Sequence, residues 1–275
     1  MKTSEKLNIL KQNLKNMERV IIAFSGGVDS TFLLKAASIS GLKEILAVTA
    51  VSQSLPEEEL SFAKEITAEL NIPHRIITTD ELHDENYSNN PPDRCYYCKK
   101  ELFTKLREIA VEEGISYILD GSNIDDMKDW RPGSRAAKEL NVISPLSEAG
   151  LGKDEIRDLS KSLGLRTWDK PSSPCLSSRF PYGQKITSEA LERVGRAESY
   201  LKTFKLKELR VRDHGDIARI EVLPEEFHIL FDASVREKIN AYLKALGYKH
   251  VTLDLRGFKS GGFNEHLKIQ GSDKK

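Results

Sequence analysis

The chain has 275 residues, of which 39% are hydrophobic and 31% charged, a composition typical of a globular protein that can bury a sizeable core. Lys+Arg and Asp+Glu both number 42, so no overall electrostatic field draws the protein onto nucleic acid or a membrane; the balance concerns the whole chain and leaves room for a local basic patch. The longest apolar run, residues 20–24, is far too short to span a bilayer, and the N-terminus lacks the apolar core of a signal peptide. We therefore expect a cytoplasmic protein that makes no membrane contact.

Strand and helix patterns alternate over the first two thirds of the chain. A helical apolar face at residues 7–17 precedes an apolar strand at residues 20–24, and a glycine-rich turn then leads into a helix. The further strands predicted by apolar runs fall at residues 45–51, 75–78, 117–119 and 142–146. Such alternation predicts parallel strands with crossover helices on both faces, which is a doubly wound α/β domain over residues 1–184.

The order changes after a loop at residues 171–183. A helix, two strands, a long helix and a last strand are predicted, in that order, at residues 188–204, 209–212, 218–222, 225–246 and 251–255. This pattern indicates a small α+β domain over residues 185–260, for substrate binding or oligomerisation. Residues 261–275 are predicted to form a flexible tail.

The segment SGGVDS, residues 25–30, directly follows the first predicted strand and opens a helix. Gly26 and Gly27 allow a polyanion to approach the backbone closely, the hydroxyls of Ser25 and Ser30 can donate to phosphate oxygens, and a helix N-terminus favours negative charge. A Gly-Gly pair by itself is as compatible with a plain tight turn. The placement between strand and helix favours a phosphate site.

The fourth predicted strand ends in a polar segment, residues 120–126, that we expect to face the SGGVDS loop, because ligands of open α/β sheets bind at the carboxyl ends of strands. Asp125 and Asp126 fit a solvated turn as well as they fit a Mg²⁺ or ribose site. No Walker A pattern is present, since residues 150–153 lack its spacing and its Ser or Thr. Cleavage of ATP to AMP is therefore favoured over transfer of the γ-phosphate.

Three cysteines are the second feature of the sequence that indicates chemical function. Cys95 and Cys98 stand one helical turn apart, and Cys175 lies in a loop that we expect to converge on the same sheet edge, so all three can meet. A zinc site, a redox dithiol and three unrelated thiols are the alternatives. Zinc would need a fourth ligand, and none of the six histidines has ligand spacing, whereas three thiolates suit a [4Fe-4S] cluster with one open iron. Alternatively, Cys175 is a nucleophile, because a cation such as Arg179 favours its thiolate.

Five segments together resemble the LarE family across nearly the whole chain. They read SGGVDS, PPDRCYYCKKELF, LDGSNIDDMKDWRPG, WDKPSSPCLSSRFPYG and LRVRDHGDIARIE. The first also matches SGGxDS, the loop of PP-loop ATP pyrophosphatases, which hold the β,γ-pyrophosphate while the α-phosphate is attacked. The resemblance implies an enzyme of adenine nucleotide alpha hydrolase-like fold that uses ATP and Mg²⁺, releases AMP and pyrophosphate, and acts as a homo-oligomer beside other enzymes of nickel-pincer nucleotide synthesis.

The resemblance also implies the substrate and the residues that bind it. The substrate is pyridinium-3,5-biscarboxylic acid mononucleotide, whose carboxylates are adenylylated and converted to thiocarboxylates. Asp29 and Cys175 would then be catalytic. The residues implied for ATP are Ala23, Ser25, Gly26, Gly27, Asp29, Ser30, Gly121, Asn123 and Asp125. Those implied for the mononucleotide, with Arg210 and Arg212 on one face of a strand, are Ser178, Arg179, Glu198, Arg210, Arg212 and Glu221.

Two sulfur routes are implied, and the cysteine count favours one of them. Members with only the cysteine that matches Cys175 sacrifice its sulfur, whereas members that also carry the pair matching Cys95 and Cys98 bind a [4Fe-4S] cluster and take sulfide from a donor. This chain has all three cysteines, which favours the cluster. A tRNA thiolase is the nearest rival. An ammonia-using synthetase would not need the thiols, and an ATP-sensing module would use neither the thiols nor the arginines.

Overall fold

The computed structural model describes residues 1–128 and 132–259, and the chain divides into two compact units. The first unit comprises Met1–Tyr87 and Asp93–Pro174, and the second comprises Ser88–Pro92 and the chain from Cys175 onward. The domain limits 1–184 and 185–260 stay a prediction, because compactness alone does not show that a segment folds independently. The predicted tail, residues 261–275, lies outside the described residues.

The first unit contains a four-stranded parallel sheet of order β3-β2-β1-β4. Its strands are β1 (Arg19–Ala23), β2 (Glu44–Val51), β3 (His74–Thr78) and β4 (Tyr117–Leu119). The chain moves outward from β1 to β3 and then returns to the other side of β1, so the connection direction reverses between β1 and β4. This parallel α/β sheet confirms the predicted fold class.

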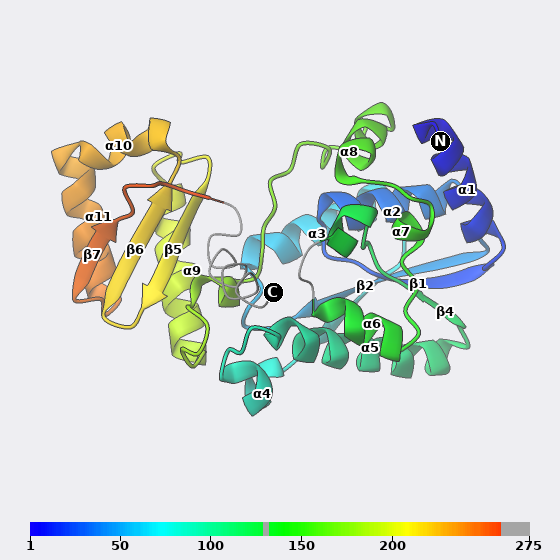
Figure 1. Cartoon of the computed structure of the whole chain (residues 1–275), viewed down its shortest axis with the longest axis horizontal. Helices are drawn as coiled ribbons and strands as arrows, with labels where there is room; N and C mark the ends of the chain where they lie inside the picture. The colour runs from blue at the N-terminus through cyan, green and yellow to red at the C-terminus, as the bar shows by residue number, and fades with distance from the viewer. Residues whose placement is uncertain (129–131, 260–275) are drawn as a thin grey trace, which may run out of the picture. The chain divides into compact units, whose positions relative to one another are not determined.

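Helices cover both faces of this sheet (Figure 1). Val20 and Ile22 of β1 pack with Phe32 on one face, whereas Ile21 between them packs with Phe103 on the other. All of these side chains are fully buried. The helices on the Phe32 side are α1 (Thr3–Lys15), α2 (Val28–Ser38), α3 (Glu57–Glu69) and α8 (Lys153–Ser162), and those on the Phe103 side are α5 (Arg94–Glu113) and α6 (Gly133–Glu139).

The predicted fifth strand, residues 142–146, is wrong. Only one isolated parallel bridge forms there, between Leu119 and Ile143, and α7 (Pro145–Glu148) starts two residues later. Proline has no backbone N–H to give to a sheet, and its fixed φ suits the first turn of a helix. Pro145 therefore ends the strand pairing almost as soon as it begins.

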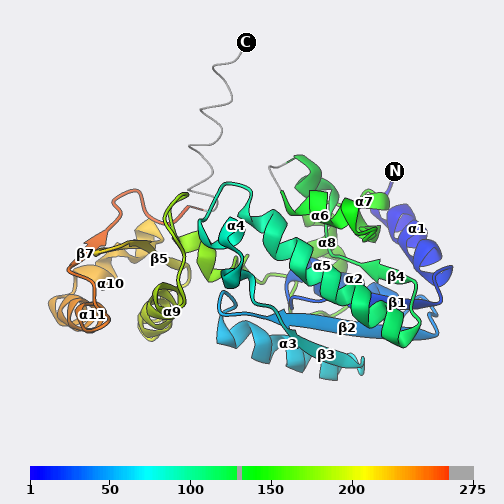
Figure 2. The same ribbon diagram turned by 90° about the horizontal axis from the view of Figure 1, so that it is seen from below.

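The second unit contains a three-stranded sheet of order β5-β6-β7. Strands β5 (Leu209–His214) and β6 (Ile217–Val222) are antiparallel, and β7 (His250–Leu253) runs parallel to β6. Helices α9 (Ser188–Lys202) and α11 (Ala233–Ala245) pack on one face, with Leu201 and Leu243 buried in the shared core (Figure 2).

The prediction of one long helix at residues 225–246 is wrong, because the helical segment is interrupted. The chain forms a 3₁₀ turn (Pro224–Glu226), α10 (Phe227–Phe231) and α11, separated at Asp232. The Asp232 carboxylate accepts a hydrogen bond from the Val235 N–H at 3.0 Å and so caps α11. An aspartate cap inside an apolar pattern starts a new helix.

Residues 88–92 belong to the second unit although the first unit flanks them on both sides. The Asn90 amide donates to the carbonyls of Phe180 and Pro181, while the Asn90 carbonyl accepts from the Gly183 N–H at 2.9 Å. Asn90 is fully buried and has a φ of 54°, a left-handed conformation that asparagine tolerates better than most residues. This short segment is thus fixed inside the second unit.

Candidate active site

The SGGVDS loop places three polar groups on one side of the backbone. The Ser25 and Ser30 hydroxyls lie 3.1 Å apart, and the Gly27 N–H donates to the Ser25 hydroxyl oxygen at 3.4 Å. Gly27 is also the N-cap of α2, has an extended backbone and has no side chain to cap the first turn of that helix. Hydroxyls and N–H groups at a helix N-terminus form a binding site for a polyanion.

The back of the same loop rests on α3 and on a lysine. Gly26 has a φ of 70°, and a Cβ there would stand 3.4 Å from the backbone of Ala63. The Gly26 carbonyl accepts a hydrogen bond from Lys170 Nζ at 3.2 Å, and that ammonium also pairs with Glu59 at 2.8 Å. The loop therefore has one side that carries the Ser25 and Ser30 hydroxyls and another side that is anchored.

Gly121, after β4, lies close to the backbone of the loop. A Cβ at Gly121 would stand 3.0 Å from the Ser30 nitrogen and 3.1 Å from its Cα. Only glycine leaves enough room for the end of β4 to lie against the start of α2. This contact lies where the connection direction reverses, which is where open α/β sheets bind ligands.

Asn123 presents a donor in the same segment. Its Oδ1 accepts from the N–H groups of Asp125 and Asp126, which fixes the orientation of the amide, and its fully buried Nδ2 has no partner within the described structure. Asp125 Oδ2 accepts from the Lys153 N–H at 2.9 Å and thereby caps α8. Asn123 thus has a donor available, whereas Asp125 supports the loop. The ATP roles of both stay predictions.

The cysteine pair lies at the start of α5. Cys95 is exposed and Cys98 half-buried, and both occupy the first turns of this helix, which begins at Arg94. Side chains at i and i+3 share a helix face, so the two thiols can serve one metal group. No three His, Cys, Asp or Glu side chains are grouped as metal ligands within residues 1–128 and 132–259. Cys175 opens the second unit.

The second unit brings several of the residues predicted for the mononucleotide into one hydrogen-bond network. Arg179 is 2% exposed and is held by two parallel hydrogen bonds, from Nε and Nη2 to the two carboxylate oxygens of Glu198, both at 2.8 Å. Its Nη1 donates to the Cys175 carbonyl at 3.2 Å and to the Ser178 hydroxyl at 2.8 Å. Glu198 also accepts from the Val211 N–H of β5. Arg179 therefore links the Cys175 segment to the sheet.

A second buried pair lies on the neighbouring strands. Arg212 Nη2 donates to Glu221 at 2.8 Å, and Arg212 Nη1 donates to the Ser178 carbonyl at 2.9 Å. The other Glu221 oxygen accepts from Arg219 at 3.0 Å. Within these contacts, Glu198 and Glu221 act as the counter-charges of the arginines.

Arg210 has a different electrostatic environment. Burial, followed by repulsion from Arg179, lowers the pKa of Arg210 to about 10, so the guanidinium stays protonated at neutral pH. Arg212, two residues along β5, adds further repulsion. Bringing a dianionic phosphate group to this cluster would relieve that repulsion, and guanidinium groups bind phosphate through paired donors.

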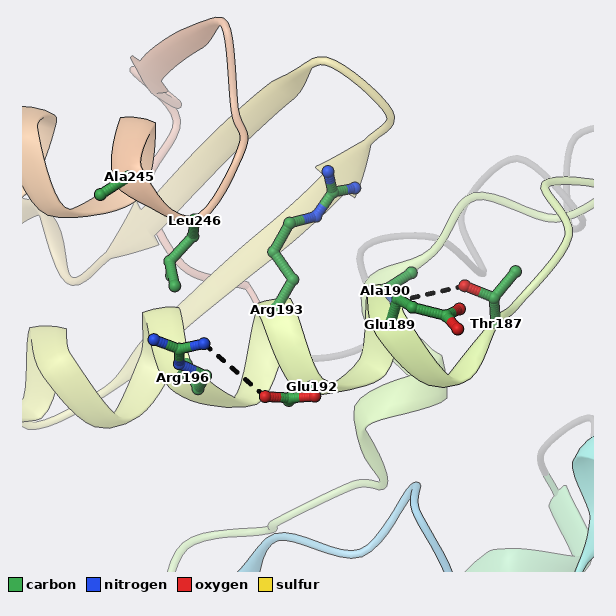
Figure 3. A pocket seen from close by; sticks show the side chains of 8 residues that line it. All are labelled: Thr187, Glu189, Ala190, Glu192, Arg193, Arg196, Ala245 and Leu246. Carbon is green, nitrogen blue, oxygen red and sulfur yellow. Dashed lines mark hydrogen bonds and ion pairs between the residues drawn. The ribbon is translucent and has the colours of Figure 1, made fainter.

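A groove of the second unit is lined by other residues. It has a volume of about 380 Å³ and runs between α9 and the end of α11 (Figure 3). Its arginines are already paired, since Arg196 contacts Glu192 at 3.6 Å and Arg193 turns away to the buried carboxylate of Asp213 at 2.6 Å. This groove therefore offers a ligand little uncompensated charge.

Similarity to known proteins agrees with this geometry. The family described as "Queuosine biosynthesis protein QueC" matches residues 19–89, which include the SGGVDS loop. The chain is 41% identical over 259 residues to pyridinium-3,5-bisthiocarboxylic acid mononucleotide synthase of Lactiplantibacillus plantarum, with 92% of each chain covered. It is 45% identical over 263 residues to "Uncharacterized protein slr1717" of Synechocystis sp., which covers 95% of this chain and 98% of that one.

A more distant similarity extends over part of the chain. The tRNA-specific 2-thiouridylase MnmA of Trichlorobacter lovleyi is 26% identical over 190 residues, covering 57% of this chain and 53% of its own. The parallel sheet, the loop after β1 and these relatives define a PP-loop enzyme that uses ATP. Within that class, the chain belongs to the LarE family, whose Lactiplantibacillus member is the mononucleotide synthase.

Sequence reasoning missed the residues that anchor the site. Lys170 contacts the SGGVDS loop and Glu59 contacts Lys170, both from positions far from that loop in the chain. Lys170 lies in the WDKPSSPCLSSRFPYG segment, but nothing in that segment or near Glu59 signals such a contact. The pairing of Arg179 with Glu198 was also not predicted, although both were proposed for the site. Only the tertiary structure brings these residues together.

Proposed function

We propose that this protein is an ATP-dependent sulfur transferase that converts the two carboxylates of pyridinium-3,5-biscarboxylic acid mononucleotide to thiocarboxylates. In each activation a carboxylate oxygen attacks the α-phosphate of ATP, so that an acyl-adenylate forms and pyrophosphate leaves. A sulfur nucleophile then attacks the acyl carbon, and AMP leaves with the former carboxylate oxygen. The observation that carries the proposal is the SGGVDS loop, with its hydroxyls and the Gly27 N–H on one side, in a chain 41% identical to such a synthase.

The first unit would hold ATP. Ser25, Ser30 and the N-terminus of α2 bind the β- and γ-phosphates, and Asp29 in the first turn of α2 supplies a carboxylate for Mg²⁺. Asn123 Nδ2, which is buried without a partner in the described structure, is a suitable donor to a nucleotide oxygen. These groups stabilise the charge that develops on the leaving pyrophosphate.

The second unit would hold the mononucleotide. Arg210 and Arg212 bind its phosphate, Ser178 and Arg179 complete the set, and Glu198 and Glu221 keep the guanidinium groups in position. The lowered pKa of Arg210, caused first by burial and then by Arg179, supports an anion as its partner.

Of the described helices, none combines the length and apolar character that a membrane crossing needs. Three reduced thiols suit a reducing compartment, which supports the cytoplasm.

The three thiols fit a [4Fe-4S] cluster in their chemistry. Cys95 and Cys98 share one helix face, and Cys175 is the third thiolate of the set. When bound through three cysteines, such a cluster has one iron open to exogenous sulfide. Cys95 and Cys98 of α5 would be two of its ligands, and Cys175, in the segment that Arg179 fixes, would be the third. Sacrifice of the Cys175 sulfur is the alternative.

One experiment tests the activity. Purified protein is given ATP, Mg²⁺, sulfide and the mononucleotide under anaerobic conditions, and the released nucleotides and the product mass are measured. We expect AMP, pyrophosphate and replacement of one oxygen by sulfur in each carboxyl group. Release of ADP and phosphate would refute the pyrophosphatase chemistry, and thiolation of tRNA instead of the mononucleotide would refute the substrate.

A second measurement separates the sulfur routes. Iron and acid-labile sulfide are measured in the wild type and in Cys95→Ala, and the Cys175 peptide is weighed after turnover. A cluster predicts iron in the wild type, its loss in Cys95→Ala, several turnovers with added sulfide, and an unchanged Cys175 mass. A single turnover that leaves Cys175 lighter by one H₂S would refute the cluster and assign the sulfur to Cys175.

A further inference from the structure

We propose that Lys170 is a positioning residue of the phosphate loop, which fixes the Gly26–Gly27 peptide so that the Gly27 N–H points into the pyrophosphate site. This inference rests on the proposed function, because it assigns to Lys170 a role in binding the pyrophosphate part of ATP. Lys170 lies outside the SGGVDS motif, 144 residues from Gly26 along the chain.

Two hydrogen bonds define the orientation of this peptide. On one side the Gly26 carbonyl accepts from Lys170 Nζ at 3.2 Å, and on the other the Gly27 N–H donates to the Ser25 hydroxyl at 3.4 Å. In a trans peptide the C=O and the following N–H point in opposite directions. Holding the carbonyl toward Lys170 therefore holds the N–H toward the hydroxyls of Ser25 and Ser30.

This peptide needs such a restraint because glycine stands on both sides of it. Rotation of this peptide changes ψ of Gly26 and φ of Gly27, which is −76° here. Because glycine occupies positive and negative φ with similar ease, a Gly-Gly peptide can rotate at little cost. A rotated peptide would turn its carbonyl oxygen toward the pyrophosphate, and two negative groups would then face each other. The contact with Lys170 disfavours that state.

Lys170 is itself held in place from three directions. Its ammonium pairs with Glu59 at 2.8 Å and lies 3.8 Å from the centre of the Phe62 ring. Arg157 of α8 donates to the carbonyls of Trp168 and Lys170, at 2.8 and 3.0 Å, which fixes the backbone of this segment. The lysine side chain is only 17% exposed, so little freedom remains for it to leave Gly26.

A purely structural role is separable from this one because the chain offers a matched cation. Arg166 also lies over the Phe62 ring, at 4.7 Å, and pairs with Glu65 at 2.7 Å. No contact between Arg166 and the phosphate loop occurs among the described hydrogen bonds and ion pairs. Removing either cation costs packing on Phe62, but only loss of Lys170 frees the Gly26 carbonyl.

The test measures binding of Mg²⁺-pyrophosphate to the full-length protein by calorimetry, together with the thermal unfolding midpoint. Lys170→Met should weaken pyrophosphate binding about tenfold, the effect of losing one well-oriented hydrogen bond to a charged group. It should raise the KM for ATP more than it lowers kcat, and leave mononucleotide affinity unchanged. Lys170→Arg, which keeps a charged donor, should restore part of the affinity.

Two controls decide what the loss means. Arg166→Met should change pyrophosphate affinity by less than about twofold. Glu59→Gln, which removes the ion pair that holds Lys170 at Gly26, should weaken pyrophosphate binding by less than Lys170→Met does, and it remains informative if Lys170→Met does not fold. An equal loss in Arg166→Met, or wild-type affinity in Lys170→Met or, where that variant does not fold, in Glu59→Gln, would overturn the proposal. A wild type that binds no pyrophosphate would instead refute the proposed function.

Discussion

The two proposed phosphate sites, one in each unit, would bind phosphate groups by different physical means. The loop at residues 25–30 uses neutral hydroxyls, backbone N–H groups and a helix N-terminus, all from consecutive residues. The arginine cluster, formed by Arg179, Arg210 and Arg212, uses buried full charges. The carboxylates of Glu198 and Glu221 neutralise two of them. Changes in the loop should therefore affect binding and catalysis first, whereas removing a counter-charge in the cluster should also affect folding.

The largest effect should follow removal of a buried counter-charge. Glu198→Ala leaves the Nε and Nη2 of Arg179, which is 2% exposed, without the carboxylate oxygens that accept from them, so the unfolding free energy should fall by about 3–5 kcal/mol. Urea denaturation measures this loss. Glu192→Ala on the same helix removes an exposed pair with Arg196 and should cost less than about 1 kcal/mol. Equal costs would mean that the buried pair is not special.

A substitution in the SGGVDS loop should lower the reaction rate strongly and the stability of the fold only slightly. Asp29→Ala removes the carboxylate proposed for Mg²⁺, so kcat for pyrophosphate release should fall by about two to three orders of magnitude. The unfolding midpoint should hardly move. Asp154→Ala removes an acidic residue from the first turn of α8 and provides the matched control. A comparable loss of activity in Asp154→Ala would contradict a special role for Asp29.

A substitution in the arginine cluster should weaken binding of the mononucleotide without weakening binding of ATP. Arg210→Ala should weaken mononucleotide binding at least about tenfold, because a charged donor to phosphate is lost, while ATP affinity should change by less than about twofold. Titration calorimetry with each ligand measures both. Arg196→Ala tests whether any arginine of the second unit has the same effect. Parallel losses for both ligands would indicate a damaged fold and not a phosphate contact.

The smallest effect should follow the addition of a Cβ where two backbone segments lie close together. The Cβ added by Gly121→Ala would meet Ser30 backbone atoms at 3.0 and 3.1 Å, and relieving that contact should cost about 1–3 kcal/mol and weaken ATP binding. In Gly195→Ala the nearest atom is the flexible end of Leu176, at 3.2 Å. ATP affinity should therefore be unchanged in Gly195→Ala. If both variants bind ATP like the wild type, close approach at Gly121 is not required.

Sequence analysis was most successful where neighbouring residues determine the structure. β1, the turn at Gly26 and the start of α2 follow from one short segment, because strand, glycine and helix signals are consecutive there. It failed where one residue overrides a pattern, as Pro145 does when it ends the predicted fifth strand.

Contacts between distant residues were beyond its reach. The alternation along β5 placed Arg210 and Arg212 on one face, but nothing local predicted that Glu221 would pair with Arg212. The hydrogen bond from Lys170 to the Gly26 carbonyl likewise depends on how α3, α8 and the SGGVDS loop pack. The individual roles of the site residues stay predictions for the same reason.

The segment at residues 88–92 limits how this protein can be divided. The chain passes between its two units three times, after Tyr87, after Pro92 and after Pro174, so no single cut yields two complete parts. A fragment ending at Pro174 would retain Asn90 but lose the Phe180 and Pro181 carbonyls that accept its amide hydrogens. Recombination at one site would therefore split the second unit, and exchanging it between relatives requires two coordinated grafts.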